Sequence, residues 1–217
     1  MAYEICSGLV VSFLAIAGIV AWFRLDNEWD YESVDADKIH GRSLFYENHI
    51  AIPMLWYQTW NAFICLVLSE YRDAIMIAHH VVTVALVYLT FHPFLQYYGM
   101  FFFGMPEVTS VPLIFIVIFK HFPGLKVRFA DFNWACRWVF GVLFLAIRLG
   151  MWSWVSVQYW MVTITILRNG TSHSVLVHVF FMAANVFLTT LQWIWGSRVV
   201  TSMIRQVSGS PSKDHTD

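Results

Sequence analysis

The chain has 217 residues, of which 59% are hydrophobic and only 12% are charged. A soluble domain of this length carries about twice that charged fraction, so the composition excludes an ordinary water-soluble globule and indicates a polytopic membrane protein. The formal net charge is -1 and no run of Lys and Arg occurs, which also excludes a surface built to bind nucleic acid.

Apolar stretches of about 20 residues predict transmembrane helices, because a helix of that length crosses the hydrocarbon core. We expect six of them, near 5–23, 48–68, 73–92, 98–119, 131–152 and 173–197. The shorter apolar stretch 153–168 is rich in Trp, Tyr and β-branched residues. It is either a seventh span, a re-entrant segment or an interfacial segment.

The distribution of Lys and Arg distinguishes six spans from seven, since cytoplasmic loops carry the excess. With six spans the amino-terminal side holds Arg72, Lys120, Lys126, Arg128, Arg198, Arg205 and Lys213, and the opposite side holds Arg24, Lys38, Arg42 and Arg168. With seven spans this bias nearly vanishes. The distribution therefore favours six spans with both termini in the cytosol.

Polar segments divide the chain into three parts. The first span and an acidic loop form 1–37. We expect the whole acidic stretch 24–47, which includes Glu47, to be a solvated loop or surface helix. The membrane domain covers 38–200. The remaining segment, 201–217, ends in small polar residues and is expected to be a disordered tail.

The adjacent His79 and His80 lie in the apolar run 74–91, where burying two imidazoles is costly. Asp73 precedes His80 by seven residues, so the two lie within about 20° on one helical face. Thr83 follows at hydrogen-bonding spacing from either ring. A carboxylate or hydroxyl that fixes the tautomer of an imidazole is what acid–base catalysis requires.

Other polar residues are expected at membrane depth. Glu107 and Thr109 lie in the fourth span, and Arg148 in the fifth is a partner for Glu107 or a clamp for an anionic group. Tyr57, Gln58 and Asn61 lie in the second span, and together these polar residues suggest a polar pocket inside a ring of helices. Polar residues also join membrane helices without any chemistry, through hydrogen bonds of about 0.6 kcal/mol. Trp residues 152, 154, 160, 193 and 195 are expected to form an interfacial belt.

These residues resemble the TLC-domain family, which includes the ceramide synthases. The segment 73–83, DAIMIAHHVVT, is similar to the family signature D-x(5)-HH-x-x-T, and Glu107, Arg148 and the stretch LQWIW resemble further family elements in order. Two features depart from the pattern. Asn61 stands where relatives carry Asp, and Pro106–Ser110 retains one acid of two. An amide cannot act as a base at neutral pH.

The resemblance implies a barrel of six helices whose inner face holds the paired histidines, with a fatty acyl thioester such as acyl-CoA as the donor. It implies catalytic roles for His79, His80, Asp73 and Glu107, and substrate-binding roles for Arg148, Asn61, Tyr57, Thr83 and Thr109. No metal or bound cofactor is expected, because a di-iron site needs several His clusters and the chain has one HH pair. The expected location is the endoplasmic reticulum or another intracellular membrane.

Two functions remain open. One is acyl transfer to an amine-bearing lipid, and the other is a non-catalytic protein that binds lipid, regulates lipid composition, pairs with a second copy or serves as a subunit of a membrane complex. An inward-facing site around a cavity favours the enzyme, whereas a cavity plugged by aromatic residues favours the alternative.

Overall fold

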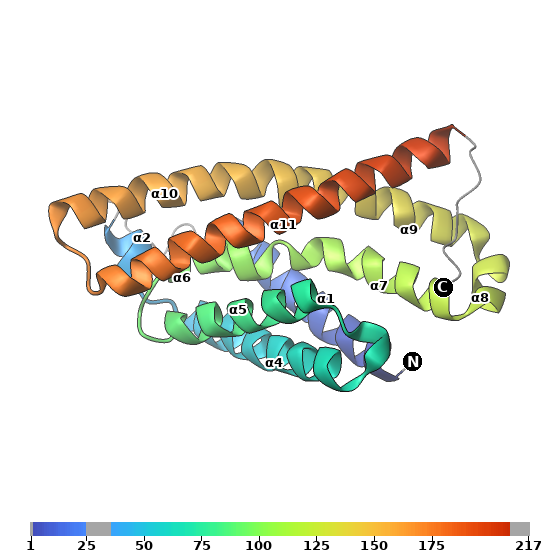
Figure 1. Ribbon diagram of the computed structural model, residues 1–217, viewed down its shortest axis with the longest axis horizontal. Coiled ribbons are helices and arrows are strands. Elements are labelled where there is room, and N and C mark those ends of the chain that lie inside the picture. Colours follow the sequence, from blue (N-terminus) through green and yellow to red (C-terminus); the bar gives the residue numbers. More distant parts are fainter. Residues whose placement is uncertain (1, 25–35, 209–217) are drawn as a thin grey trace.

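The computed structural model describes residues 2–24 and 36–208, and all regular structure in these ranges is helical (Figure 1). The long α-helices are α1 (Ala2–Arg24), α4 (Ile52–Val67), α5 (Ala74–Thr90), α7 (Glu107–His121), α9 (Ala130–Leu143), α10 (Trp152–Asn169) and α11 (Val175–Val207). Short α-helices are α2 (Ala36–His40), α3 (Leu44–Tyr46), α6 (Gln96–Gly99) and α8 (Pro123–Arg128). Turns of π-helix form η3 (Glu47–Ala51), η5 (Met100–Gly104) and η6 (Phe144–Met151), and η4 (Ser69–Tyr71) is a 3-10 turn.

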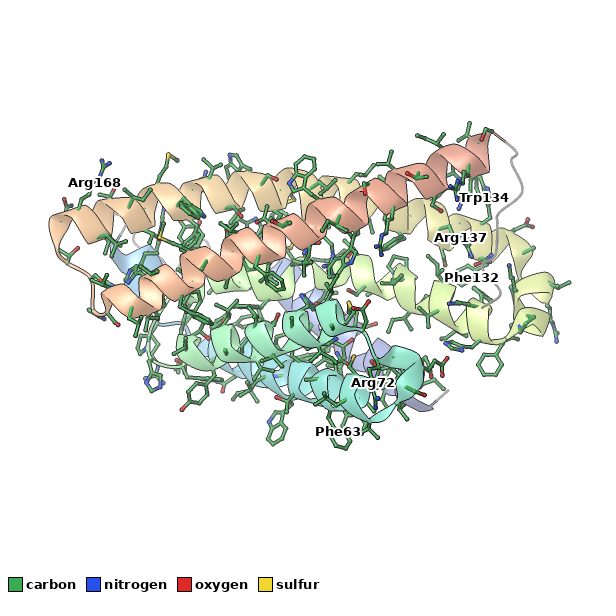
Figure 2. The ribbon with its side chains drawn as sticks, viewed as in Figure 1. Phe63, Arg72, Phe132, Trp134, Arg137 and Arg168 are labelled. Atoms are coloured by element: carbon green, nitrogen blue, oxygen red, sulfur yellow. The ribbon has the colours of Figure 1, made fainter. Side chains whose placement is uncertain are left out.

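The helical membrane protein expected from the sequence is confirmed. Among the described residues, five continuous helices are long and apolar enough to cross a bilayer, and α5 is a further, shorter apolar helix. Side chains such as Phe63 and Trp134 are more than half exposed, and Figure 2 shows Phe63 at the outer edge of the molecule. Lipid can solvate such apolar surface, so it needs no protein partner.

The stretch 153–168 forms neither a separate span nor a re-entrant segment. It lies in α10, which continues α9 and η6 into one 40-residue helix, Ala130–Asn169. The helix ends at Gly170, whose φ of 68° is left-handed, and there the Thr171 N–H donates to the Ile166 carbonyl. A glycine in this conformation is a common helix stop. The 153–168 alternatives are thus corrected to an extension of the fifth helix.

The described part of the chain begins and ends at the same end of the bundle (Figure 1). α1 begins and α11 ends at the right of Figure 1, as an even number of crossings requires. We call this the terminal end. The opposite end, where α2 and α6 lie, is the loop end. Because α11 continues to Val207, residues 201–207 of the predicted tail are helical. Residues 209–217 and 25–35 of the acidic stretch lie outside the described residues.

Part of the predicted solvated acidic stretch is buried instead. Glu47 is only 7% exposed and accepts two hydrogen bonds from the Arg42 guanidinium, at 2.8 and 2.9 Å. The Gln96 amide also donates to Glu47 and to the Thr90 carbonyl. This network attaches the segment before α4 to the turn after α5, so it closes the loop end.

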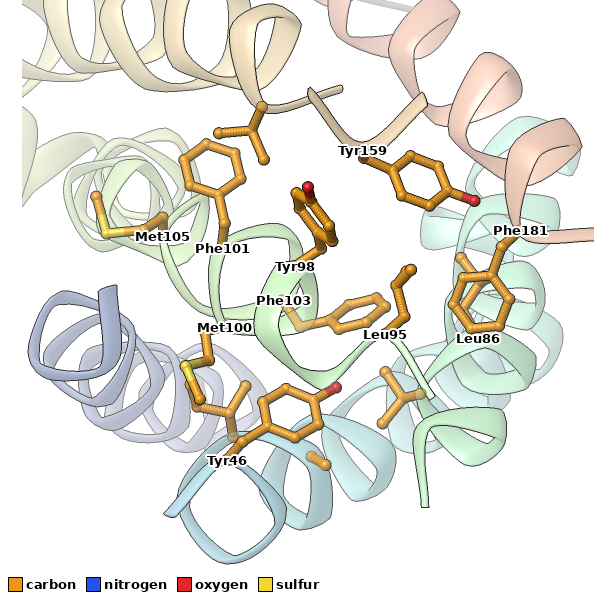
Figure 3. Packing of buried hydrophobic residues seen from close by; sticks show 14 of the residues in the cluster. Tyr46, Leu86, Leu95, Tyr98, Met100, Phe101, Phe103, Met105, Tyr159 and Phe181 are labelled. Carbon is orange, nitrogen blue, oxygen red and sulfur yellow. The ribbon is translucent and has the colours of Figure 1, made fainter. Parts of the chain in front are cut away.

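Aromatic side chains fill the interior behind that network. Tyr98, Phe101, Tyr159 and Phe181 point into the space between the helices (Figure 3), and the ring centroids of Tyr98 and Tyr159 lie 5.6 Å apart. A void of only about 20 Å³ remains beside Tyr159 and Phe181. The barrel is therefore packed at the loop end, and open space lies nearer the terminal end.

A glycine pair holds α1 in the bundle. A Cβ on Gly104 would lie 2.6 Å from the Gly18 Cα, so only glycine lets the two backbones approach this closely. α1 also packs along α7. The first span is therefore an integral part of the helical barrel.

Candidate functional site

A cavity of about 330 Å³ lies between α4, α5, α7, the α9–η6 segment and α11. It contains seven of the nine residues expected to act in catalysis or binding: Tyr57, Asn61, His79, His80, Glu107, Thr109 and Arg148. The apolar part of its wall comes from Met76, Leu113, Phe140, Phe144, Trp195 and Val199. Seven of the nine predicted residues thus line one cavity, although they come from four separate helical segments.

His80 is the best oriented of the site residues. Its ring is buried, and its Nδ1 lies 2.5 Å from the Gln58 Oε1. An amide oxygen only accepts, so His80 Nδ1 carries the hydrogen and donates it. The remaining ring nitrogen, Nε2, then has a lone pair free for a proton.

His79 lies beside His80, with ring centroids 5.2 Å apart and planes at 63°. Its other neighbour is Trp195 of α11, whose ring meets it edge to face at 5.6 Å. The His79 Nδ1 is buried and has no hydrogen-bond partner. The two imidazoles therefore differ in surroundings, because one is held by an amide and the other packs against an indole.

Asp73 does not orient a histidine ring, contrary to the expectation. It is exposed and forms the N-cap of α5, where its carboxylate accepts from the Ile75 N–H at 2.7 Å. Thr83 is also outside the cavity, and its hydroxyl donates to the His79 carbonyl of its own helix at 2.8 Å. Sequence spacing placed both residues on the correct helix, but local backbone groups take their hydrogen bonds first.

Arg148 joins η6 to the start of α7. Its guanidinium donates to the Thr109 Oγ1 at 2.7 Å, the Ser110 Oγ at 3.1 Å and the Pro106 carbonyl at 3.1 Å. Glu107 is buried on the same wall. Within the described part of the chain, no ion pair shorter than 4.0 Å joins Arg148 to Glu107. Of the two roles expected for Arg148, the ion pair with Glu107 is thus replaced by hydrogen bonds to neutral oxygens, one of them the hydroxyl oxygen of Thr109.

Asn61 is tied to the first helix. Its side chain is 3% exposed, and its Oδ1 accepts from the Tyr3 hydroxyl at 2.8 Å. The amide oxygen is therefore occupied from outside the cavity. Tyr57, one turn earlier on α4, lines the cavity directly.

Two of the five tryptophans expected in an interfacial belt point inward instead. Trp152 is 3% exposed and donates to the Thr189 hydroxyl at 2.9 Å, and Trp195 contacts His79. Trp154 and Trp193 are each 57% exposed, as a belt position would be. The sequence signal that distinguishes them is helical phase: Gln192 and Gly196, the neighbours of Trp195, are buried and mark the inner side of α11.

Among the described residues, no group of three His, Cys, Asp or Glu side chains is arranged to hold a metal ion. Comparison with families finds that a family model described as the TLC domain matches residues 2–201. Curated proteins and solved structures yield no match to this chain. The matched region begins with α1. The family domain therefore includes this helix, which the sequence analysis had assigned to 1–37, outside the predicted membrane domain 38–200.

Proposed function

Since the chain belongs to the TLC-domain family and is a membrane protein with a lipid-related function, we propose that it transfers a fatty acyl group from a thioester donor such as acyl-CoA to an amine-bearing lipid. The observation that carries the proposal is the cavity that brings His79, His80, Glu107 and Arg148 together. Four groups that are costly to bury in a membrane exceed what helix packing needs.

In this reaction His80 is the general base. The amine of the acceptor attacks the thioester carbonyl and gives its proton to the free Nε2 of His80. The carbon–sulfur bond then breaks, and the leaving thiolate takes that proton back. The products are an amide and a thiol, so no further reactant or bound cofactor is required.

The other residues bind and polarise the substrates. His79, beside His80, donates a hydrogen bond to the carbonyl oxygen as negative charge develops there. Arg148 is held rigidly by α7 and attracts an anionic group of the donor. Glu107 on the same wall accepts a hydrogen bond from the amine, and Tyr57 contacts the acceptor beside it.

The test follows a labelled acyl chain. Purified protein in lipid nanodiscs is incubated with ¹³C-labelled palmitoyl-CoA and long-chain amines, and lipids are analysed by mass spectrometry. Label in a new amide lipid is expected from the wild type and from His92→Ala, because His92 is exposed beyond the end of α5. His79→Ala and His80→Ala should each reduce it about 10²-fold or more. Equal amounts from all four proteins would refute the assignment.

Asn61 favours a second candidate, a non-catalytic protein that binds lipid, regulates lipid composition or assembles with a second copy or other subunits. Its amide cannot take a proton, and its oxygen is already bonded to Tyr3. Tightly held lipid with no transfer of label would support this candidate. For either function we place the protein in the endoplasmic reticulum or another intracellular membrane, with cytosolic termini.

A further inference from the structure

The cavity is too small for a whole long-chain lipid. Its volume of about 330 Å³ is at the lower limit of ligand sites, which span roughly 300–1,000 Å³. Toward the loop end the aromatic core leaves a void of about 20 Å³, which is enough for one water molecule. The cavity therefore holds a reacting group and its surroundings, and a long hydrocarbon chain must leave it.

Most walls of the cavity are tightly joined. α4 packs along α5, and α7 packs along α9. The space between α4 and α7 is covered by α1, which is attached through the Tyr3–Asn61 hydrogen bond and by its close packing on α7. A hydrocarbon chain that left through the α4–α5, α7–α9 or α1–α7 wall would have to separate long helix contacts.

The wall between the α9–η6 segment and α11 is joined at two glycines. A Cβ on Gly196 would lie 2.7 Å from the Leu149 Cδ1, and a Cβ on Gly141 would overlap the Met203 sulfur. Leu149 and Met203 thus fill the space that each glycine leaves. These two contacts bring α11 close to the α9–η6 segment.

The seam between α5 and α11 is different. The two helices contact each other sparsely, and in Figure 1 α11 diverges from α5 toward the terminal end. Across the seam the cavity is lined by Met76 and His79 on one side and by Trp195 and Val199 on the other. The edge-to-face contact of His79 with Trp195 closes it. His79 and Trp195 are both partly exposed.

We infer that the seam between α5 and α11 is a lateral portal to the bilayer, through which the hydrocarbon chain of a long-chain lipid reaches His79, and that Trp195 gates it. The hydrocarbon chain of the lipid stays in the apolar interior of the bilayer while its reactive end lies in the cavity. The terminal end is a poorer route for a chain, because it carries charged side chains such as Lys120, Lys126 and Arg205. The inference rests on the proposed function for the reaction that His79 takes part in. Binding of the hydrocarbon chain at the seam can be measured without any turnover.

Photolabelling tests the portal. Protein in phosphatidylcholine nanodiscs is irradiated with palmitic acid that carries a diazirine at mid-chain, with and without excess unlabelled palmitic acid, and labelled peptides are mapped by mass spectrometry. Label that the competitor removes is expected on Met76, Trp195 and Val199. Label on the outward Phe63 and Trp134 should resist competition, because bulk lipid contacts them. Competed label on Tyr98 and Tyr159, or none anywhere, would overturn the inference.

A matched pair of variants tests the gate. An edge-to-face ring pair favours the closed form by a factor of about two to ten, so Trp195→Ala should raise the competed label on Met76 by that factor. Trp193→Ala is the control, since Trp193 is 57% exposed on another side of the same helix turn. Equal label in both variants would contradict gating. Trp195→Phe, which keeps a ring, provides the comparison if the alanine variant does not fold.

The two proposals fail separately. His80→Ala should reduce acyl transfer about 10²-fold or more and leave the competed label at the seam in place. Seam labelling without any transfer in the wild type would refute only the proposed reaction. Transfer accompanied by competed label on the aromatic core would refute only the portal.

Discussion

Gln58→Leu removes the side chain that orients His80. Gln58 is 4% exposed, and its Oε1 accepts from the His80 Nδ1. A hydrogen bond of this kind contributes about 0.5–1.5 kcal/mol net, and 1.4 kcal/mol is a factor of ten in a population. Loss of Gln58 should therefore shift the tautomers of His80 by up to about tenfold toward the form that has hydrogen on Nε2.

The tautomer can be read by ¹⁵N NMR of histidine-labelled protein in nanodiscs. The chain has nine histidines, so the His80 signals are identified by their loss in His80→Ala. In the Gln58→Leu variant we expect the protonated nitrogen to change from Nδ1 to Nε2, and kcat for acyl transfer to fall by up to about tenfold while KM stays constant.

Gln192→Leu is the matched control. Gln192 is also buried, at 2% exposure, but its Oε1 has no hydrogen-bond partner and it is not part of the cavity wall. This variant should retain the wild-type spectrum and rate. An unchanged His80 spectrum in Gln58→Leu would refute the reasoning, whatever the effect on the rate, because the role of Gln58 acts only through that ring.

Three further variants test other contacts. Asp73→Ala should lower stability by about 1 kcal/mol through loss of a helix cap, while acyl transfer per folded molecule stays within about twofold of the wild type; a larger loss of turnover would return Asp73 to the catalytic site. Gly18→Ala should lower the stability by about 1–3 kcal/mol, measured as a lower apparent Tm, because its Cβ would lie 2.7 Å from backbone atoms of η5. Gly8→Ala is its control and should lower the stability less, because its Cβ would meet only a side chain, at 3.3 Å. Thr109→Val removes an acceptor of Arg148 and should raise the KM for acyl-CoA several-fold; an unchanged KM would show that this bond does not position Arg148 for the donor.

The chemistry of the site was readable from residue type and depth. A Glu or Arg side chain in an apolar segment is costly to expose to lipid, so the sequence predicted that Glu107 and Arg148 face the interior of the protein. The same argument placed His79 and His80 beside them. Their actual partners were not readable, because hydrogen bonds between helices depend on the relative rotation and height of those helices.

The hydroxyl and carboxylate roles show the limit of spacing arguments. Asp73 and Thr83 lie at suitable intervals from the histidines, yet each bonds to the backbone of its own helix. Such local bonds need no tertiary contact and form at little entropic cost. Gln58, in contrast, lies 22 residues from His80 and meets it only because α4 and α5 pack side by side.

The sequence alone determined that this is a helical membrane protein with costly polar groups inside it, because the hydrophobic content, the length of each apolar run and the desolvation of charge are properties of the chain itself. Only the tertiary structure decided that 153–168 prolongs one long helix, that aromatic residues fill the loop end and that Trp195 lies over His79. These features depend on which side chains of distant segments come into contact, and no periodicity along one segment contains that information.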